Sequence, residues 1–352
     1  MRKWLLLALL LMTTGLGVGL YFWQFEQPAQ AQALALDRNL LALLPPNSTS
    51  LVGVDVARLK QTPVYRHIEE ESRRSGGSKR NDLEEFVAKT GFDPRQDVDE
   101  MLVASYEDPS QQDSDSQFVA VARGRFNLSS LKGELRARGA TVETYKGFEI
   151  FGPENRPSRS RRPGSSREEQ GRFTFLDEKT ALAGTRSAVL AAIDRKLSGG
   201  PSLLANTALL GRAQNISGSN QVWAVSDRPG QVITRAIPRK HAPQGSNFAR
   251  IFSSMQNSTF ALDLMNGVDL RAAGLCKTTQ DAKALADAAR GIVALGRLSA
   301  SQNEPELMAV FDNIQVDDRD TELNISVRID LPTFEKLLEK GRSRGRTVTA
   351  RF

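Results

Sequence analysis

The sequence predicts an α+β fold in which helices pack on one face of antiparallel or mixed sheets, preceded by one N-terminal hydrophobic helix. Three observations predict this class. Apolar residues alternate over several short segments, as they do in half-buried strands. Many of these segments follow one another at hairpin distance, which implies antiparallel pairing. Stretches with apolar residues on one helical face lie between them, and residues 4–23 carry no charge.

The N-terminal segment has the length and composition of a membrane-spanning helix. As a helix, the residues from Trp4 to Trp23 would reach about 30 Å, the thickness of a hydrocarbon core. Arg2 and Lys3 precede the segment and no basic residue follows before Arg38, so the N-terminus is expected to stay in the cytoplasm. Aromatic rings at both ends suit the two membrane interfaces. We therefore expect a single-pass protein of the bacterial inner membrane, with the bulk of the chain in the periplasm.

Two further properties of this segment follow from its small residues. Ala31 and Ala33 offer cleavage sites, so secretion after removal of the segment is the alternative to an anchor. A signal core usually has about 7–15 apolar residues, and the greater length here favours the anchor. Gly15 and Gly19 form a G-x-x-x-G pair through which two such helices could pack as a homodimer.

A first α+β lobe is expected over residues 37–230, after a linker rich in Gln, Ala and Pro that ends near residue 36. Alternating apolar residues predict strands over 50–57, 101–106, 117–123, 141–151, 172–183 and 221–226. Helical patterns occupy 63–74, 83–90, 128–138, 187–197 and 203–212. Asn127 is expected to cap the third of these helices, and Gly139 to close it.

A second lobe is expected over residues 247–341, after a Pro- and Gly-containing junction. Asn266-Gly267 between the runs 259–264 and 268–276 predicts a hairpin. A capping box from Thr278 begins a helix over 282–298. The apolar face of that helix is expected to contain Leu285, Ala289, Ile292 and Val293. A helix over 306–314, a strand over 323–329, a helix over 332–340 and a basic tail over 342–352 complete the lobe. The repeated scheme of hairpin, helices and strand suggests two related lobes.

The net charge of +6 does not indicate nucleic-acid binding. Six arginines are concentrated in an Arg-rich loop over 154–172, which has no interleaved aromatic residues for base stacking. A solvated loop is the simplest interpretation, and contact with an anionic lipid or cell-wall polymer is the alternative. The candidates for that contact are Arg159, Arg161, Arg162 and Arg167. The single cysteine, Cys276, is expected to be a small buried hydrophobic residue.

The patterns of the commonest enzymes and metal sites are missing from the sequence. Neither His67 nor His241 has a second His or Cys at ligand spacing, so no metal site is predicted. No nucleophile elbow or phosphate-binding loop occurs. Ser129 and Lys132 satisfy the S-x-x-K spacing of penicillin-recognising enzymes, but the companion motifs are absent. Ser129 is therefore expected to cap a helix, and no cofactor is predicted.

A cluster of carboxylates is the other candidate for chemistry. Asp93, Asp97, Asp99 and Glu100 lie close together in the sequence, and two carboxylates can work as an acid–base pair. The simpler interpretation is a polar turn, in which Asp93-Pro94 reverses the chain and Asp97 caps it. No catalytic residue is predicted on this basis.

Several phrases resemble a family of exported bacterial envelope proteins of unknown function, of the Acidobacteria type. They are Leu44-Pro45-Pro46-Asn47, the strand-like run Leu51–Leu59, the segment Gly91–Val98 and the segment Leu323–Asp330. The resemblance covers most of the chain after residue 40. It implies an exported, membrane-associated protein and provides no catalytic residues.

Together these features predict a membrane-anchored extracytoplasmic binding or scaffold module of the bacterial envelope that is not an enzyme. The expected partners are an envelope protein or an anionic polymer. The alternative is an envelope hydrolase that uses the carboxylates or Ser129.

Overall fold

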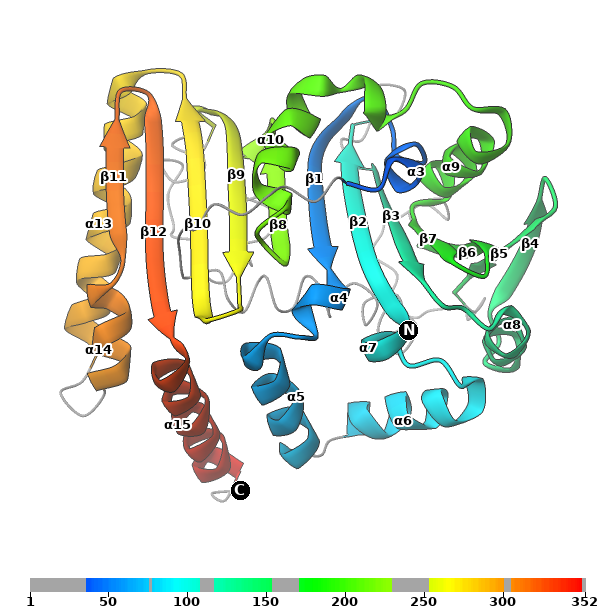
Figure 1. Cartoon of the computed structure of the whole chain (residues 1–352), viewed down its shortest axis with the longest axis horizontal. Helices are drawn as coiled ribbons and strands as arrows, with labels where there is room; N and C mark the ends of the chain where they lie inside the picture. Colours follow the sequence, from blue (N-terminus) through cyan, green and yellow to red (C-terminus); the bar gives the residue numbers. More distant parts are fainter. Residues whose placement is uncertain are drawn as a thin grey trace, which may run out of the picture. The chain divides into compact units, whose positions relative to one another are not determined.

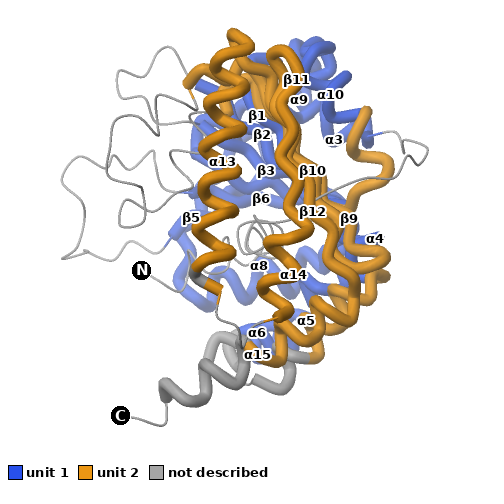
Figure 2. The backbone as a smooth tube through the Cα atoms, turned by 90° about the vertical axis from the view of Figure 1, so that its left-hand side faces the viewer, with its two compact units in different colours: residues 1–21, 35–60, 72–214 blue, residues 22–34, 61–71, 215–352 orange. Residues whose placement is uncertain are grey.

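The computed structural model describes residues 36–75, 78–107, 117–153, 171–229, 253–300 and 305–349, and its elements form an α+β fold with antiparallel sheet (Figure 1). The chain divides into two compact units (Figure 2). Of the described residues, unit 1 takes those in 36–60 and 72–214, and unit 2 takes those in 61–71 and 215–349. Each unit combines helices with antiparallel strands, as the sequence predicts.

The sheet of unit 1 has the strand order β1-β2-β3-β7-β6-β5-β4, and every neighbouring pair is antiparallel. The strands are β1 (Ser48–Asp55), β2 (Val98–Tyr106), β3 (Gln117–Gly124), β4 (Thr141–Tyr145), β5 (Phe148–Gly152), β6 (Arg172–Asp177) and β7 (Thr180–Gly184). Leu51, Leu102 and Leu182 are almost completely buried. Strands β1, β2 and β7, which carry these leucines, therefore contribute to the core of unit 1.

The helices of unit 1 pack around this sheet. They are α3 (Arg38–Leu41), α4 (Val56–Leu59), α6 (Ser78–Thr90), α7 (Pro94–Asp97), α8 (Leu128–Ala137), α9 (Arg186–Ser198) and the short 3-10 helix η2 (Leu203–Ala205). Helices α5 (Pro63–Ser75) and α10 (Thr207–Ser217) each run across a boundary between the units. Helix α9 packs on β3, β6 and β7, and Val189 and Ile193 on its inner face are fully buried.

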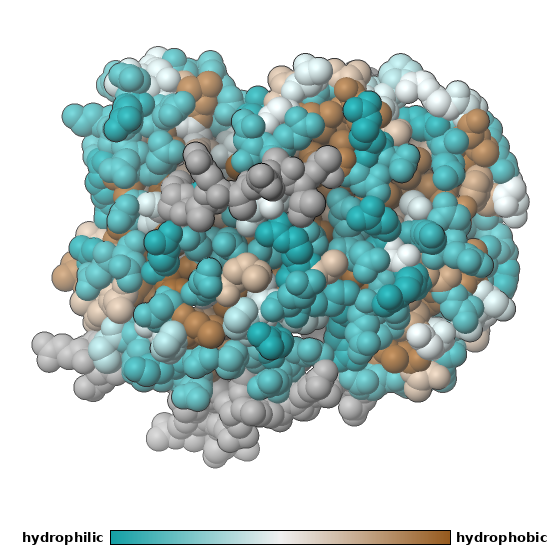
Figure 3. All heavy atoms as spheres, viewed as in Figure 1, coloured by the Kyte–Doolittle hydropathy of each residue, from teal (hydrophilic) through white to brown (hydrophobic). Residues whose placement is uncertain are grey.

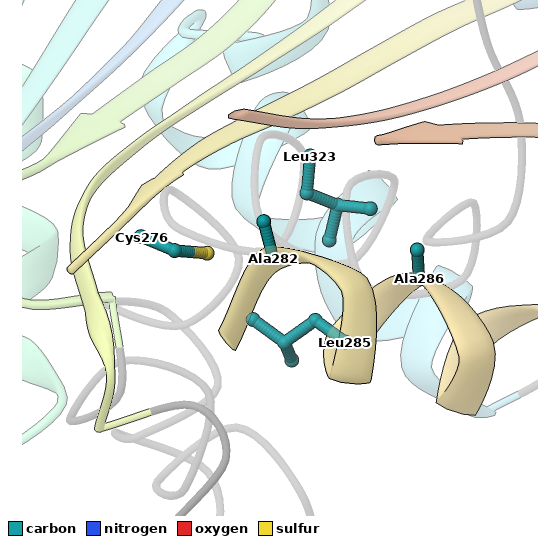
Figure 4. Close-up of a cluster of buried hydrophobic side chains, with 5 residues drawn as sticks. All are labelled: Cys276, Ala282, Leu285, Ala286 and Leu323. Carbon is teal, nitrogen blue, oxygen red and sulfur yellow. The ribbon is translucent and has the colours of Figure 1, made fainter. Parts of the chain in front are cut away.

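The sheet of unit 2 has the strand order β8-β9-β10-β12-β11 and is antiparallel between all neighbours. The strands are β8 (Val222–Ser226), β9 (Met255–Asp263), β10 (Gly267–Cys276), β11 (Gln315–Arg319) and β12 (Glu322–Asp330). The helices are α13 (Thr279–Ser299), α14 (Pro305–Asp312) and α15 (Leu331–Thr349). Helix α13 packs against β10, β11 and β12 through a cluster formed by Cys276, Ala282, Leu285, Ala286 and Leu323 (Figure 4).

The two units share one topology. Each begins with three neighbouring antiparallel strands in chain order, β1-β2-β3 in unit 1 and β8-β9-β10 in unit 2. A helix follows the third strand, α8 in unit 1 and α13 in unit 2. The last strand of each unit then pairs with the third, β7 with β3 and β12 with β10. The two units thus have a common order of elements, in which β8, expected in the first lobe over 37–230, belongs to unit 2.

Two tight turns were not predicted. The segment 141–151 is not one strand but the hairpin β4–β5, whose turn residues Lys146 and Gly147 have φ of 47° and 88°. The segment 172–183 is likewise the hairpin β6–β7, closed by Glu178 and Lys179. Apolar residues occur on both sides of each two-residue turn, and Lys146-Gly147 lacks the Asn or Asp that normally marks such a turn. The pattern therefore looked continuous.

Four other expectations are corrected. Val56 and Ala57 begin helix α4 instead of extending β1, because the Asp55 carboxylate caps the helix by accepting from the Arg58 N–H at 2.9 Å. Strand β11 was missed because its sequence is almost entirely polar. The predicted tail from residue 342 is helical through Thr349, as part of α15. Ile292 is 56% exposed, so it does not lie on the buried face of α13.

Candidate functional site

The residues predicted to contact a membrane or a polyanion lie outside the described part of the chain. They are Trp4, Gly15, Gly19 and Trp23 of the N-terminal segment and Arg159, Arg161, Arg162 and Arg167 of the Arg-rich loop. The two cleavage candidates, Ala31 and Ala33, and His241 also lie outside it.

The described residues contain neither a helix that could cross a membrane nor a cluster of metal-ligating side chains. None of the helices there has the length and apolar character needed to cross a membrane. In the same ranges, no group of three or more His, Cys, Asp or Glu side chains is arranged to hold a metal ion.

Asp93, the first carboxylate of the predicted cluster, holds helix α7 in place. It is only 8% exposed and is the N-cap residue, accepting from the Arg95 N–H at 3.0 Å. The Arg95 guanidinium donates to both Asp93 oxygens, at 2.8 Å from Nε and 2.9 Å from Nη2, and to Glu84 at 3.1 Å. The hydrogen bonds that Arg95 donates to Asp93 are the main reason that the pKa of Arg95 is raised. Asp93 thus has a structural role, with Arg95 as its fixed partner.

Asp97 closes the same turn from the other end. Its Oδ2 accepts from the Asp93 N–H at 2.8 Å, and its Oδ1 accepts from Arg125 at 3.1 Å. Lys60 lies beside this turn and donates from Nζ to the carbonyl oxygens of Gln96 and Val98, at 2.8 and 2.9 Å. Burial is the largest influence on Lys60 and lowers its pKa, against the attraction of Asp99. The predicted polar turn is therefore confirmed, and Asp97 stabilises it.

Glu100 belongs to a second ionic group centred on Arg123. The two residues lie opposite each other on β2 and β3, with Arg123 Nη2 2.7 Å from Glu100 Oε2. Arg123 also pairs with Asp37, which caps α3 by accepting from the Asn39 N–H at 2.8 Å. Burial raises the pKa of Glu100, while Arg123 acts to lower it. The bridge joins α3 to the sheet.

Ser129 and Lys132 do not form a nucleophile–base pair. Ser129 is exposed on α8, and Asn127 is the cap residue, accepting from the Ser130 N–H at 3.2 Å. The expectation that Asn127 caps this helix is confirmed, and the expectation for Ser129 is wrong. Lys132 Nζ lies 3.0 Å from Glu149, whose pKa it holds below the usual value.

His67 lies on helix α5 with its side chain 40% exposed. Its Nε2 is 2.8 Å from Glu335 of α15, and its Nδ1 is 3.0 Å from the Pro63 carbonyl oxygen. Both contacts lie within unit 2. They tie α5 to α15.

The exposed apolar residues of helix α13 are the feature that sequence reasoning missed. Ile292, Leu295 and Leu298 are 56%, 66% and 84% exposed. On the face viewed in Figure 3, hydrophilic side chains predominate and the brown apolar areas lie between them. The sequence did indicate this exposed apolar face, because the apolar residues of α13 are spread over more of the helix surface than one buried face requires.

The comparisons with known proteins add a distant structural similarity. No protein-family model matches the sequence, and no curated protein matches it. Among solved structures, the chain is similar to TP0453 in its crystal form I, with 11% sequence identity and a TM-score of 0.42. The similarity covers 88% of this chain and 98% of that chain.

Proposed function

We propose that this chain is a membrane-anchored extracytoplasmic binding or scaffold module of the bacterial envelope, without catalytic activity, and that it belongs to the exported family it resembles. The observation that carries the proposal is the engagement of the acidic cluster in the fold. Asp93 and Asp97 hold the α7 turn, and Glu100 is bridged to β3 by Arg123. A general acid or base must be free to exchange its proton with a substrate, and a carboxylate held by a cap or an arginine is poorly suited to that role.

The placement of Ser129 also favours a binding module over a serine hydrolase. An attacking serine needs a base within hydrogen-bond reach. Lys132 is the base that the S-x-x-K spacing would supply, and its ammonium group is engaged by Glu149. A hydrolase would need a base from elsewhere in the chain.

A binding module contacts its partner through exposed side chains. Unit 2 exposes large apolar side chains on α13, and exposed apolar patches of this kind mark interaction sites more often than chance. Such a surface suits a protein partner better than an anionic polymer.

Active-site labelling tests the choice between binding module and hydrolase. The full chain in envelope membranes would be treated with a fluorophosphonate probe, beside a Ser129→Ala control. We expect no labelling above that of the control. Labelling that the substitution abolishes would mean an activated Ser129 and would favour the hydrolase.

Cross-linking in intact cells tests the binding role directly. Formaldehyde treatment should convert the wild-type chain into discrete higher-mass adducts. Ser129→Ala and Asp99→Asn, which leave the Asp93 cap and the Arg123 bridge untouched, should form the same adducts in the same amounts. If no adduct forms with the wild-type chain, the scaffold proposal is contradicted.

A further inference from the structure

Helix α13 (Thr279–Ser299) has two apolar faces, of which only one is buried. On the inner face, Ala282, Leu285 and Ala286 are at most 3% exposed and pack in the cluster of Figure 4. On the outer face, Leu295 and Leu298 are 66% and 84% exposed. Figure 2 shows α13 along its length, beside the strands of unit 2. The outer face of this helix is thus apolar and largely accessible.

The outer face follows the spacing of a helix-pairing seam. Its exposed residues are Ala284, Ala288, Gly291, Leu295 and Leu298, which recur alternately four and three residues apart. An average spacing of 3.5 residues keeps one stripe facing a partner helix along its whole length. None of these five residues is charged. The pattern is that of a surface for another helix.

The sizes of the seam residues indicate which helix fits. Small residues, Ala284 and Ala288, precede Gly291, and large ones, Leu295 and Leu298, follow it. In an antiparallel pair of identical helices centred on Gly291, Leu298 of one copy meets Ala284 of the other, and Leu295 meets Ala288. Large side chains thus fill the space left by small ones, as close packing requires. Such a self-complementary patch is what a two-fold symmetric interface needs.

The centre of the seam leaves room for close approach. A Cβ atom placed on Gly291 would meet no atom within 4 Å, so a second helix could come near the backbone there. Ile292, which is 56% exposed, would lie beside Ile292 of the second copy in this arrangement. Gly291 and Ile292 thus lie close to the same residues of the second copy. This symmetry favours a second copy of the chain over an unrelated helix as the partner.

The two arginines beside the seam are already paired within the chain. Arg290 lies 3.0 Å from Asp287 and 2.6 Å from Asp318, and Arg297 lies 3.2 Å from Asp312. These two arginines therefore add no unpaired positive charge to the face that a second copy would approach. A helix that lies on an anionic membrane usually has a basic border, whereas acidic and basic groups alternate here. The charges favour a second copy over a lipid surface.

Helix α8 provides an internal comparison. It follows the third strand of unit 1 as α13 follows the third strand of unit 2. Its exposed residues are Ser129, Gly133, Arg136 and Ala137, none of which has a large apolar side chain. The shared topology therefore does not require an apolar outer face, and the seam on α13 is not a consequence of that topology.

We propose that α13 is a self-association surface through which two copies of this chain pair as antiparallel helices, with the two-fold axis at Gly291. The seam from Ala284 to Leu298 is about 21 Å long at 1.5 Å per residue. One helix pair of this length is smaller than a standard interface of about 1,600 Å², so pairing should depend on concentration. Confinement of the chain to a membrane would raise that concentration.

Disulfide trapping in the full chain tests this geometry. The native Cys276 is 2% exposed, so an added cysteine is the reactive thiol. Under copper–phenanthroline oxidation in membranes, Gly291→Cys should form a disulfide-linked dimer. Gly133→Cys on α8 is the matched control, because its Cβ also meets nothing within 4 Å. If Gly291→Cys forms no more disulfide-linked dimer than Gly133→Cys does, the proposal is overturned.

The direction of pairing has its own controls. Ala284→Cys alone should not cross-link, because the two copies of residue 284 are about 21 Å apart in the antiparallel pair. Mixed chains with Ala284→Cys and Leu298→Cys should cross-link to each other. Lys283→Cys, exposed on the same helix but off the seam, should give no dimer. Self-linking of Ala284→Cys would mean parallel helices and would refute the two-fold arrangement.

A charged substitution distinguishes this seam from other contacts. Leu295→Glu is expected to reduce the Gly291→Cys dimer at least tenfold without unfolding the chain, because residue 295 is largely exposed. Dimers held by the Gly15–Gly19 segment would not respond to this change. A fluorescent probe attached to the thiol of Gly291→Cys reports contact with lipid. If brominated lipids quench its fluorescence and Gly291→Cys forms no disulfide-linked dimer, the outer face of α13 lies against a bilayer and the proposal is overturned.

Discussion

Glu100 is the carboxylate of unit 1 whose ionisation is most clearly linked to its burial. Burial raises its pKa above 4.5, although Arg123 opposes the shift. The folded state therefore favours the protonated form of Glu100. The stability associated with Glu100 falls as the pH rises from the pKa of the unfolded chain towards the higher pKa of the folded state. Replacement by glutamine keeps the shape of the side chain and removes this titration.

Glu100→Gln should accordingly be at least as stable as the wild-type chain at pH 7. Its advantage should shrink as the pH falls and Glu100 itself becomes neutral. Urea unfolding at several pH values measures the difference. A deficit of Glu100→Gln that grows with rising pH would show that the bridge to Arg123 outweighs the cost of burial.

Gly124, at the end of β3, lies where its backbone closely approaches another segment. A Cβ added there would overlap the carbonyl oxygen of Asp97, which also accepts from the Arg125 N–H at 2.8 Å. Because the obstacle is backbone, Gly124→Ala should lower the free energy of unfolding by about 1–3 kcal/mol. Gly133→Ala, in an open position of α8, should instead raise it by about 0.8–1 kcal/mol. Thermal melting of both variants provides the comparison, and equal effects would contradict the argument.

At the scale of elements, the β9–β10 hairpin shows what local sequence can predict. Asn266-Gly267 predicted the hairpin, and Gly267 does adopt a positive φ of 122°. The loop is also held by Gln221, which is fully buried. Its Oε1 accepts from the Leu264 N–H at 2.6 Å, and its Nε2 donates to Asp263 at 2.9 Å. This distant contact could not be foreseen from the residues of the loop.

Gln221→Leu should therefore destabilise the chain although it keeps the residue's approximate size. It leaves the buried Leu264 N–H without its acceptor, which costs about 1–3 kcal/mol. Gln221→Glu, which retains an acceptor for that N–H but faces Asp263, separates loss of the acceptor from loss of the donor. Chemical denaturation of the variants measures both effects. If Gln221→Leu is as stable as the wild-type chain, the contact does not hold the loop.

Predictions from sequence succeeded where a local signal determines an element. The caps at Asn127 and Thr278 were expected and are present. Errors arose where partners distant in sequence decide the structure. Strand β11 is polar and exists because β12 pairs with it. Ile292 was placed on the buried face because the pattern of α13 contains two apolar stripes, and only the packing shows which one faces the sheet.

The candidate site was predicted in part for the same reasons. Asp93 was expected to turn the chain, and the structure confirms it. The pairing of Arg123 with both Glu100 and Asp37 joins three separate segments, which no local pattern reveals. The position of Lys132 against Glu149 also depends on the packing of α8 beside β5.

At the scale of the whole molecule, the proposal is an anchored envelope module built from two units of common topology. The described residues account for the folded units, and the anchor is predicted from the charge-free run 4–23. Placement outside the cytoplasm is the claim on which the envelope function depends.

Protease accessibility combined with mass spectrometry of the N-terminus tests that claim most directly. Protease added to intact spheroplasts should digest the chain. In untreated cells, the chain should remain in the membrane fraction after a carbonate wash and should retain its N-terminal segment. Protection of the chain until the spheroplasts are lysed would contradict the extracytoplasmic location, and a mature N-terminus at Gln32 or Leu34 would contradict the anchor.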